Sequence, residues 1–180
     1  MAKKKLVRLV VDTDVLCSAN YKEEPLSRSC RGFLMAISSN QLKVVVTSKS
    51  EIERRNHQSN FSRKWHLTML RKGRVHICEN EDYLKTEETI LCMKDDLSFS
   101  EYSAMLKDVH LVHAARHTDG KIVSRDDVVR LLFSRASKKV NILKGIIWVN
   151  PTRDEEQPIK WLGDGAPKEK HRRLGNYHTG

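Results

Sequence analysis

The chain has 180 residues, which is the length of one domain and enough to bury a hydrophobic core. Hydrophobic residues make up 39% and charged residues 31%, as in globular proteins, and no apolar run approaches the roughly 20 residues of a membrane helix. The apolar stretch after the basic residues 1–5 is short and meets Asp12, so a signal peptide is not expected. The four cysteines form no CxxC pair and no metal-ligand spacing, which favours reduced thiols in a cytoplasmic protein.

In the first half of the chain, short apolar runs alternate with segments of helical spacing. Residues 5–11 and 41–47 are rich in Val and Leu and predict two buried strands. Between them, residues 25–39 begin at a proline and predict a helix. A long helical region follows the second strand, and Gly73 separates it from a third strand at 74–78.

The second half continues this alternation. The acidic residues 79–97 predict a helix, and Ser98 with Glu101 has the capping-box pattern that begins another helix, which runs to about Thr118. The remaining elements are a strand, a helix and a strand, at 121–124, 126–137 and 146–149. Because every strand is a continuous apolar run, the sequence predicts an α/β fold, a single-domain, doubly wound parallel sheet with helices on both faces.

The residues after the last strand have a different composition. Residues 151–180 contain prolines, glycines and the basic run 168–173. We therefore expect one domain over residues 1–150, followed by a mostly irregular basic tail over 151–180.

Charge is distributed unevenly along the chain, whose formal net charge is +10. Residues 41–75, here called the basic lobe, carry nine Lys and Arg against two Glu, whereas residues 79–108 carry nine acids against three lysines. A basic lobe beside an acidic cluster suits a phosphate polymer as ligand, although a solvated helix face explains the charge density as well. The side chains expected to contact phosphates are Arg54, Arg55, Arg63, Lys64, Arg71 and Lys72.

Aspartates stand where the predicted strands and helices would bring distant carboxylates together. Asp12 ends the first strand, Asp126 and Asp127 follow the strand 121–124, and Asp108 begins the apolar stripe of its helix. The carboxyl ends of parallel strands share one edge, where sites are built, and clustered carboxylates there would hold a hard divalent cation. Each aspartate also has a structural explanation: Asp12 as a turn residue, Asp108 as an N-cap where its helix kinks, and Asp126 as the cap of the next helix.

These motifs resemble those of the PIN-domain nucleases. The resemblance rests on Val10–Leu16, on Lys107–Ala115 together with Ile122–Asp127, and on Ile147–Pro151, and it spans roughly residues 6–151. The pair of segments in the middle is its most specific part.

The resemblance implies hydrolysis of phosphodiesters, usually in RNA, by an enzyme that requires Mg²⁺ or Mn²⁺. On it, Asp12, Asp108 and Asp126 are the catalytic carboxylates that hold the metal, and Asp14 helps to shape the site. The family alone suggests the toxin half of a toxin–antitoxin pair, with an inhibitory antitoxin protein as partner, and is compatible with a homodimer.

One position departs from the family pattern. The family has a Glu about six residues past the Ser that ends the second strand, but counting from Ser48 gives Arg54. We favour Glu51 as the fourth catalytic acid, while Glu53 or no acid at all stays open. Ser48 and Glu51 could instead form a capping box.

Three further expectations concern side chains near the aspartates. Ser124 is expected to orient substrate or a bound water. His110, His113 and His117 lie along one side of a helix, and we expect them to be exposed or to contact phosphate, since no second cluster completes a zinc site. The alternative function is a nucleic-acid-binding or regulatory module with a degenerate, inactive metal site, which the missing glutamate favours. Enzymes that transfer phosphate between small molecules are disfavoured because the sequence has no Gly-rich phosphate loop.

Overall fold

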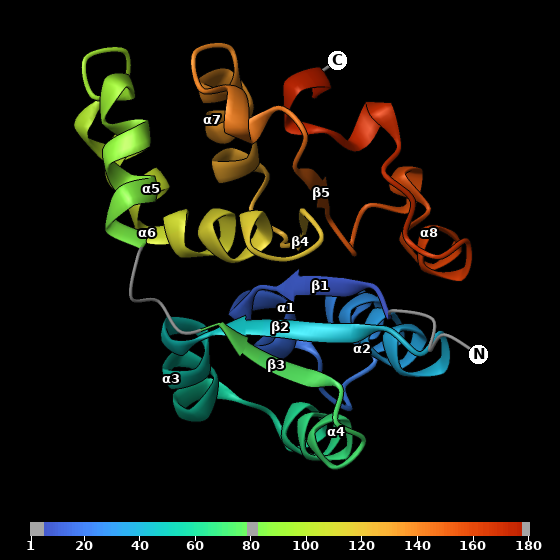
Figure 1. Ribbon diagram of the computed structural model, residues 1–180. Helices are drawn as coiled ribbons and strands as arrows, with labels where there is room; N and C mark the ends of the chain where they lie inside the picture. Colours follow the sequence, from blue (N-terminus) through green and yellow to red (C-terminus); the bar gives the residue numbers. More distant parts are fainter. Residues whose placement is uncertain (1–5, 79–82, 178–180) are drawn as a thin grey trace.

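Parallel strands form a single sheet in the order β3-β2-β1-β4-β5. The computed structural model describes residues 6–78 and 83–177, and Figure 1 shows the strands side by side. The strands are β1 (Arg8–Val11), β2 (Lys43–Thr47), β3 (Val75–Cys78), β4 (Lys121–Val123) and β5 (Ile147–Val149). The central strand β1 pairs with β2 on one side and with β4 on the other, so the sheet is doubly wound, as predicted, and the strand order reverses between β1 and β4.

Helices cover both faces of the sheet, as the sequence predicted. The α-helices of the described residues are α1 (Thr13–Ser18), α2 (Pro25–Ser39), α3 (Ser48–His57), α4 (Asn60–Arg71), α5 (Tyr83–Ile90), α6 (Phe99–Arg116), α7 (Asp127–Ser137) and α8 (Pro158–Gly163). Short 3-10 turns are η1 (Leu91–Met93), η2 (Asn141–Leu143), η3 (Asp154–Glu156), η4 (Lys170–Arg172) and η5 (Leu174–Asn176). In the part of the chain that the structure describes, no helix is long and apolar enough to cross a membrane.

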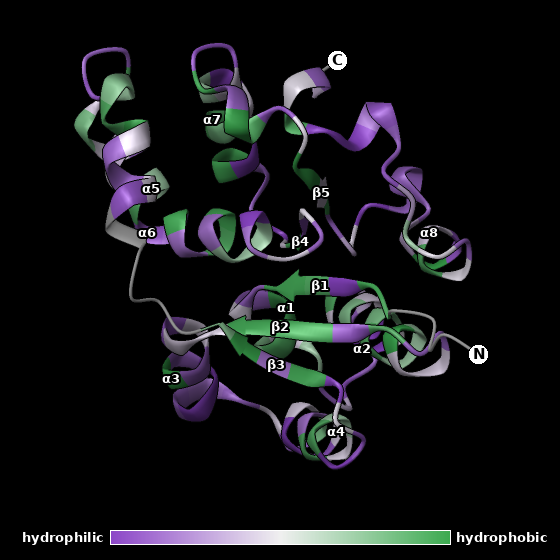
Figure 2. Ribbon diagram, viewed as in Figure 1, coloured by the Kyte–Doolittle hydropathy of each residue, from purple (hydrophilic) through white to green (hydrophobic). Residues whose placement is uncertain are grey.

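The apolar strand residues divide between two cores, one on each face. Val10, Val45 and Trp148 pack with α5, α6 and α7 on one face. Leu9 and Val44 pack with α1, α2, α4 and α8 on the other. Because both faces are covered, most successive strand residues are apolar, and Figure 2 shows the strands as largely hydrophobic ribbons.

The helical boundaries refine the sequence prediction in three places. The long region after β2 is two helices, because Gln58 is extended and Ser59 caps α4 by accepting from the Ser62 amide. The capping box of Ser98 and Glu101 is present, and α6 continues without a break through Asp108. The predicted acidic helix corresponds to α5 and η1, and its first residues, 79–82, lie outside the described residues.

The segment after Pro151 is packed against the domain. It was expected to be mostly irregular, but it contains α8 and three of the 3-10 turns. Trp161 and Leu162 are buried in the core on the α2 face, and Leu174 is buried in the opposite core. The Leu174 amide also donates to the Ile146 carbonyl at 2.9 Å. Widely spaced apolar anchors therefore make this segment part of the same domain.

Candidate functional site

A cavity of about 420 Å³ opens at the carboxyl edge of the sheet, where the strand order reverses. The arrowheads of β1 and β2 point toward this edge in Figure 1. We call it the acidic cavity, and its lining comes from the start of α1, from α3, from α6 and from the start of α7: Asp12, Thr13, Asp14, Cys17, Glu53, His57, Lys107, Asp108 and Asp126. The fold thus brings together Asp12, Asp108 and Asp126, although Asp12 is about a hundred residues from the other two in sequence.

A fully buried hydroxyl fixes the central carboxylate. Ser124 Oγ donates to Asp12 Oδ2 at 2.8 Å and accepts from the Asp126 amide at 3.1 Å. Ser124 is 0% exposed, so its hydroxyl is occupied within the protein. The expectation that Ser124 contacts substrate is therefore wrong: it is a positioning residue that links Asp12 to Asp126.

The structural explanation holds for Asp126, holds in part for Asp12 and fails for Asp108. Asp126 Oδ1 accepts from the Val129 amide at 2.8 Å and so caps α7 while the residue also lines the acidic cavity. The Asp12 side chain makes no capping hydrogen bond to α1, but a local hydrogen bond from the Thr13 backbone acts to lower its pKa, as the turn explanation expects. Asp108 lies inside the continuous helix α6, where no N-cap exists.

The carboxylates of the acidic cavity lack sufficient compensating charge. Burial raises the pKa of Asp12, and the hydrogen bond from Ser124 offsets part of that rise. Burial, followed by repulsion from Asp12, raises the pKa of Asp14 to about 7 and likewise that of Asp108 to about 7. Asp14 Oδ1 is buried without a hydrogen-bond partner among the described residues. Such a cluster of repelling carboxylates favours binding of protons or of a cation.

The donor set fits a hard divalent cation, which the family resemblance implies. Carboxylate oxygens are the ligands that Mg²⁺ prefers, and Mg²⁺ needs only one or two of them because it keeps several waters. Within the described ranges, no three His, Cys, Asp or Glu side chains already stand together as a ready-made metal site. Asp12, Asp108 and Asp126 therefore line a shared space that is open to a hydrated ion.

The structure separates the two candidate glutamates on α3. Glu51 accepts from Arg54 Nε at 2.9 Å and from Arg55 Nε at 3.3 Å, and it is not part of the cavity lining. Although burial acts to raise the pKa of Glu51, its hydrogen bonds and ion pair with Arg54 hold that pKa below the ordinary value. Glu53 lines the cavity instead. The prediction that Glu51 is the fourth acid of the site is therefore wrong, and Glu53 takes that place. Two residues apart on an α-helix, the side chains point to different sides of it.

The alternative capping role of Glu51 is wrong as well. Thr47, and not Ser48, is the N-cap of α3, and its side chain accepts from the Ser50 amide. Thr47 also bonds to Ser50 Oγ at 3.0 Å, so the entry to α3 is fixed by hydroxyls.

The prediction that Arg54 contacts phosphate is wrong. Its side chain is 7% exposed and is held by Glu51 and by a hydrogen bond to Gln58. Arg55, Arg63 and Lys64 are exposed, as that prediction requires, but none of them lines the acidic cavity.

Two side chains that can donate hydrogen bonds to an anion line the acidic cavity, and neither was predicted from the sequence. Lys107 precedes Asp108 on α6, and His57 is the last residue of α3. The only local signal for Lys107 was its position beside a candidate ligand. Both could contact a phosphate next to the carboxylates.

Two of the three histidines on α6 are buried, contrary to the expectation. His110 Nδ1 lies 2.8 Å from Thr47 Oγ1, and His113 Nδ1 lies 3.0 Å from Thr86 Oγ1. Burial, helped by Lys49 and Lys107, lowers the pKa of His110 to about 3. The reason is that α6 packs against the sheet on one side and against α5 and α7 on others, so that only His117 is exposed.

Comparisons of the chain with protein-family models, with curated proteins and with solved structures find no match. The acidic cavity is therefore the feature of the protein that bears most directly on function. Its main elements are Asp12, Asp14 and Asp108, whose pKa values are raised, and Glu53 and Asp126, which line the same space.

Proposed function

We propose that the protein is a metal-dependent endoribonuclease of the PIN type that hydrolyses phosphodiester bonds in cytoplasmic RNA. The observation that carries the proposal is the convergence of Asp12, Asp14 and Asp108 on one open cavity without sufficient compensating charge. A structural cluster of acids would be expected to have cationic partners, whereas these carboxylates face a space that can admit a cation and a phosphate.

Asp12, Asp108 and Asp126 would hold Mg²⁺ or Mn²⁺, with Glu53 in the role first given to Glu51. A bound divalent ion supplies Lewis acidity, which activates water and neutralises charge on phosphate oxygens. Ser124 keeps the Asp12 carboxylate in one orientation through its 2.8 Å hydrogen bond. This role needs no contact between Ser124 and the substrate.

Other side chains of the chain would position the phosphate. Lys107 and His57 line the same cavity as the carboxylates and can donate hydrogen bonds to phosphate oxygens. The Arg125 amide donates to Asp14 Oδ2 at 3.3 Å, and the Arg125 guanidinium lies 3.9 Å from that carboxylate. Arg125 does not line the cavity itself, and its role would be to orient Asp14 from behind.

The exposed cations of the basic lobe would hold the RNA backbone. Replacing Arg63, Lys64, Arg71 and Lys72 by Gln should weaken binding of unrelated RNA sequences alike. The log–log dependence of affinity on salt should also flatten, by about 0.7 in slope for each phosphate that the variant no longer neutralises. Anisotropy titrations at several salt concentrations measure this slope. Replacement of the exposed Lys138 and Lys144, which lie outside the lobe, is the control. An unchanged slope in the fourfold variant would mean that RNA binds elsewhere.

Metal binding and cleavage together test the proposed activity. Calorimetry should detect Mn²⁺ binding to the wild-type protein, and labelled RNA should be cut in Mn²⁺ but not with excess chelator. Asp108→Asn should lose both properties, whereas Asp164→Asn, which changes an exposed acid outside the acidic cavity, should lose neither. Cleavage that persists in chelator would overturn the assignment.

A second candidate function is a nucleic-acid-binding or regulatory module with an inactive site. It is favoured by Arg54 at the position where the family has a glutamate, and by the lack of a ready-made three-ligand metal group within the described residues. Tight RNA binding without Mn²⁺ binding and without cleavage would support this function over the nuclease.

A further inference from the structure

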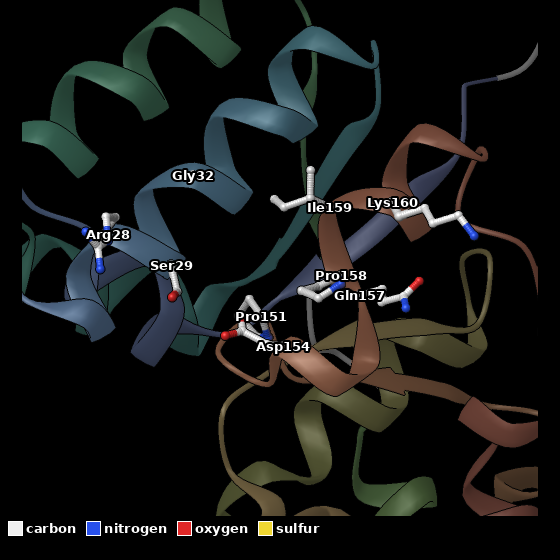
Figure 3. Close-up of a pocket in the computed structure, with 9 residues that line it drawn as sticks. All are labelled: Arg28, Ser29, Gly32, Pro151, Asp154, Gln157, Pro158, Ile159 and Lys160. Carbon is white, nitrogen blue, oxygen red and sulfur yellow. The ribbon is translucent and has the colours of Figure 1, made fainter.

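A second cavity, of about 380 Å³, lies between α2 and the start of α8. Figure 3 shows Gly32 of α2 facing Ile159 across it, with Pro151 and Pro158 on the side of the C-terminal segment. We call it the α2–α8 cavity. Its size falls in the range of about 300–1,000 Å³ that is usual for small-molecule sites, and its apolar walls suit a flat ring.

Three charged side chains at this cavity have no polar partner in the described part of the chain. Arg28, Asp154 and Lys160 make no ion pair or side-chain hydrogen bond with any described residue. Figure 3 shows the Asp154 carboxylate directed toward α2, where Ser29 lies. The neighbouring acids Asp127 and Glu155, by contrast, both pair with Arg153. The cavity thus presents one carboxylate and two cations that are available to a ligand.

A row of neighbouring residues links the α2–α8 cavity with the acidic cavity, and its two middle members, Asn150 and Arg125, line neither space. Asn150, which precedes Pro151, donates through Nδ2 to the Arg125 carbonyl at 3.2 Å. Arg125 in turn contacts Asp14 of the acidic cavity and Ser18 of α1. One residue, Arg125, therefore lies between the two spaces. A strand of nucleotides could extend from one cavity to the other, with one of its phosphates bound by Arg125.

We propose that the α2–α8 cavity binds one unpaired nucleobase of the RNA strand whose backbone enters the acidic cavity. Pro151, Pro158 and Ile159 would pack on the faces of the base, as in other single-strand binding sites. The Asp154 carboxylate accepts but does not donate, so it favours bases with an exocyclic amino group over uracil. Arg28 would contact the adjoining phosphate. This inference rests on the proposed function, since it names part of that substrate.

Gly32 offers a way to fill the cavity without disturbing the protein. A Cβ at Gly32 would meet no atom within 4 Å, and the residue lies inside α2, where leucine favours the helix more than glycine does. Gly163 is also helical and also has open space around a Cβ, but it does not line the cavity. Gly163→Leu is therefore the matched control for Gly32→Leu.

The experiment measures binding of oligocytidylate and oligouridylate of equal length by fluorescence anisotropy, in excess chelator so that no cleavage occurs. The wild-type protein should prefer oligocytidylate. Gly32→Leu should weaken the binding of oligocytidylate about tenfold, because the loss of one stacked base lowers affinity by roughly that factor. Gly163→Leu should leave the affinity unchanged. Asp154→Asn, an exposed substitution that leaves the fold intact, should remove the preference for cytosine over uracil.

Two results would overturn the subsite. One is that the wild-type protein and Gly32→Leu bind oligocytidylate with equal affinity. The other is that Gly32→Leu changes the self-association of the protein and leaves its affinity for RNA unchanged. The first result with normal Mn²⁺-dependent cleavage leaves the nuclease proposal standing without this subsite. The expected binding changes in a protein that never cleaves RNA would uphold the subsite and reject the nuclease.

Discussion

The acidic cavity and the contacts of Glu156 show two ways in which this protein uses partly buried carboxylates. Glu156 pairs with Arg130 and with Arg172, whose side chains are 3% and 6% exposed. In the acidic cavity, Asp12 and Asp108 have no such partner among the described residues, and the nearest cation to Asp14 is Arg125 at 3.9 Å. Carboxylates thus tie elements together in one place and leave negative charge unneutralised in the other.

The two arrangements should respond in opposite ways to neutralisation. Removing one member of a buried ion pair leaves an uncompensated charge and costs stability. Removing one of several repelling carboxylates relieves repulsion and costs ligand binding instead. Stability and metal binding, measured on the same variants, can therefore distinguish structural acids from functional ones.

The largest effect is expected from Asp12→Asn. Cleavage should fall at least about 1,000-fold, because a metal ion supplies several kcal/mol of transition-state stabilisation. The Tm in chelator should stay level or rise, since asparagine can still accept from Ser124 Oγ and no longer repels Asp14. Single-turnover cleavage in Mn²⁺ and thermal unfolding measure the two quantities. A fall in Tm with full activity would place Asp12 among the structural acids.

The opposite result is expected from Glu156→Gln. The free energy of unfolding should fall by about 1–3 kcal/mol, because the buried Arg130 and Arg172 each lose one charged partner, although Arg130 keeps Asp127 and Arg172 keeps Glu169. Mn²⁺ affinity should not change. Glu155→Gln is the matched control: Glu155 is 67% exposed in its pair with Arg153, so its loss should leave the free energy of unfolding nearly unchanged. Equal urea midpoints for both variants would contradict the distinction.

The two glutamates of α3 repeat the comparison within one helix. Glu53→Gln should weaken Mn²⁺ binding about tenfold, as expected when a group beside a metal is neutralised. Glu51→Gln should leave Mn²⁺ binding intact but lower stability by about 1–3 kcal/mol, because the buried Arg54 loses its carboxylate partner. Calorimetry and urea unfolding of both variants would show whether these roles are reversed.

The last prediction concerns the pH dependence of stability. The pKa values of Asp14 and Asp108 are about 7 in the folded protein, against 3.8 ordinarily, so between these values the folded state binds more protons than the unfolded state. Their contribution to stability should therefore decline as pH rises from about 4 to about 7 in chelator. Asp108→Asn should flatten that decline, and Mn²⁺ should reverse it. A wild-type stability that rises across this window, with the same slope in Asp108→Asn, would exclude the shift.

Much of the fold was present in local patterns. The continuous apolar runs that became β1 to β5 predicted a parallel sheet covered on both faces, because such strands bury side chains in both directions. Asp12 and the segment Ser124–Asp126 follow β1 and β4 directly, so the parallel sheet alone brings them to one edge. Asp108 depended on α6 reaching the same edge. The predicted apolar stripe does not describe that helix, because every residue from Val109 to Ala115 is buried.

The partners of long polar side chains were decided only by the tertiary structure. Nothing local distinguishes Glu51, which pairs with the buried Arg54, from Glu53, which faces the acidic cavity, because the choice depends on how α3 is rotated against its neighbours. The burial of His110 depends on Thr47, which is 63 residues away in sequence. The α2–α8 cavity likewise exists only because Trp161 anchors α8 beside α2. The spacing of apolar residues within one segment indicates whether it forms a helix or a strand and which side is buried. Ion pairs, buried hydrogen bonds and cavities, by contrast, form between elements that are distant in sequence, and no local pattern records them.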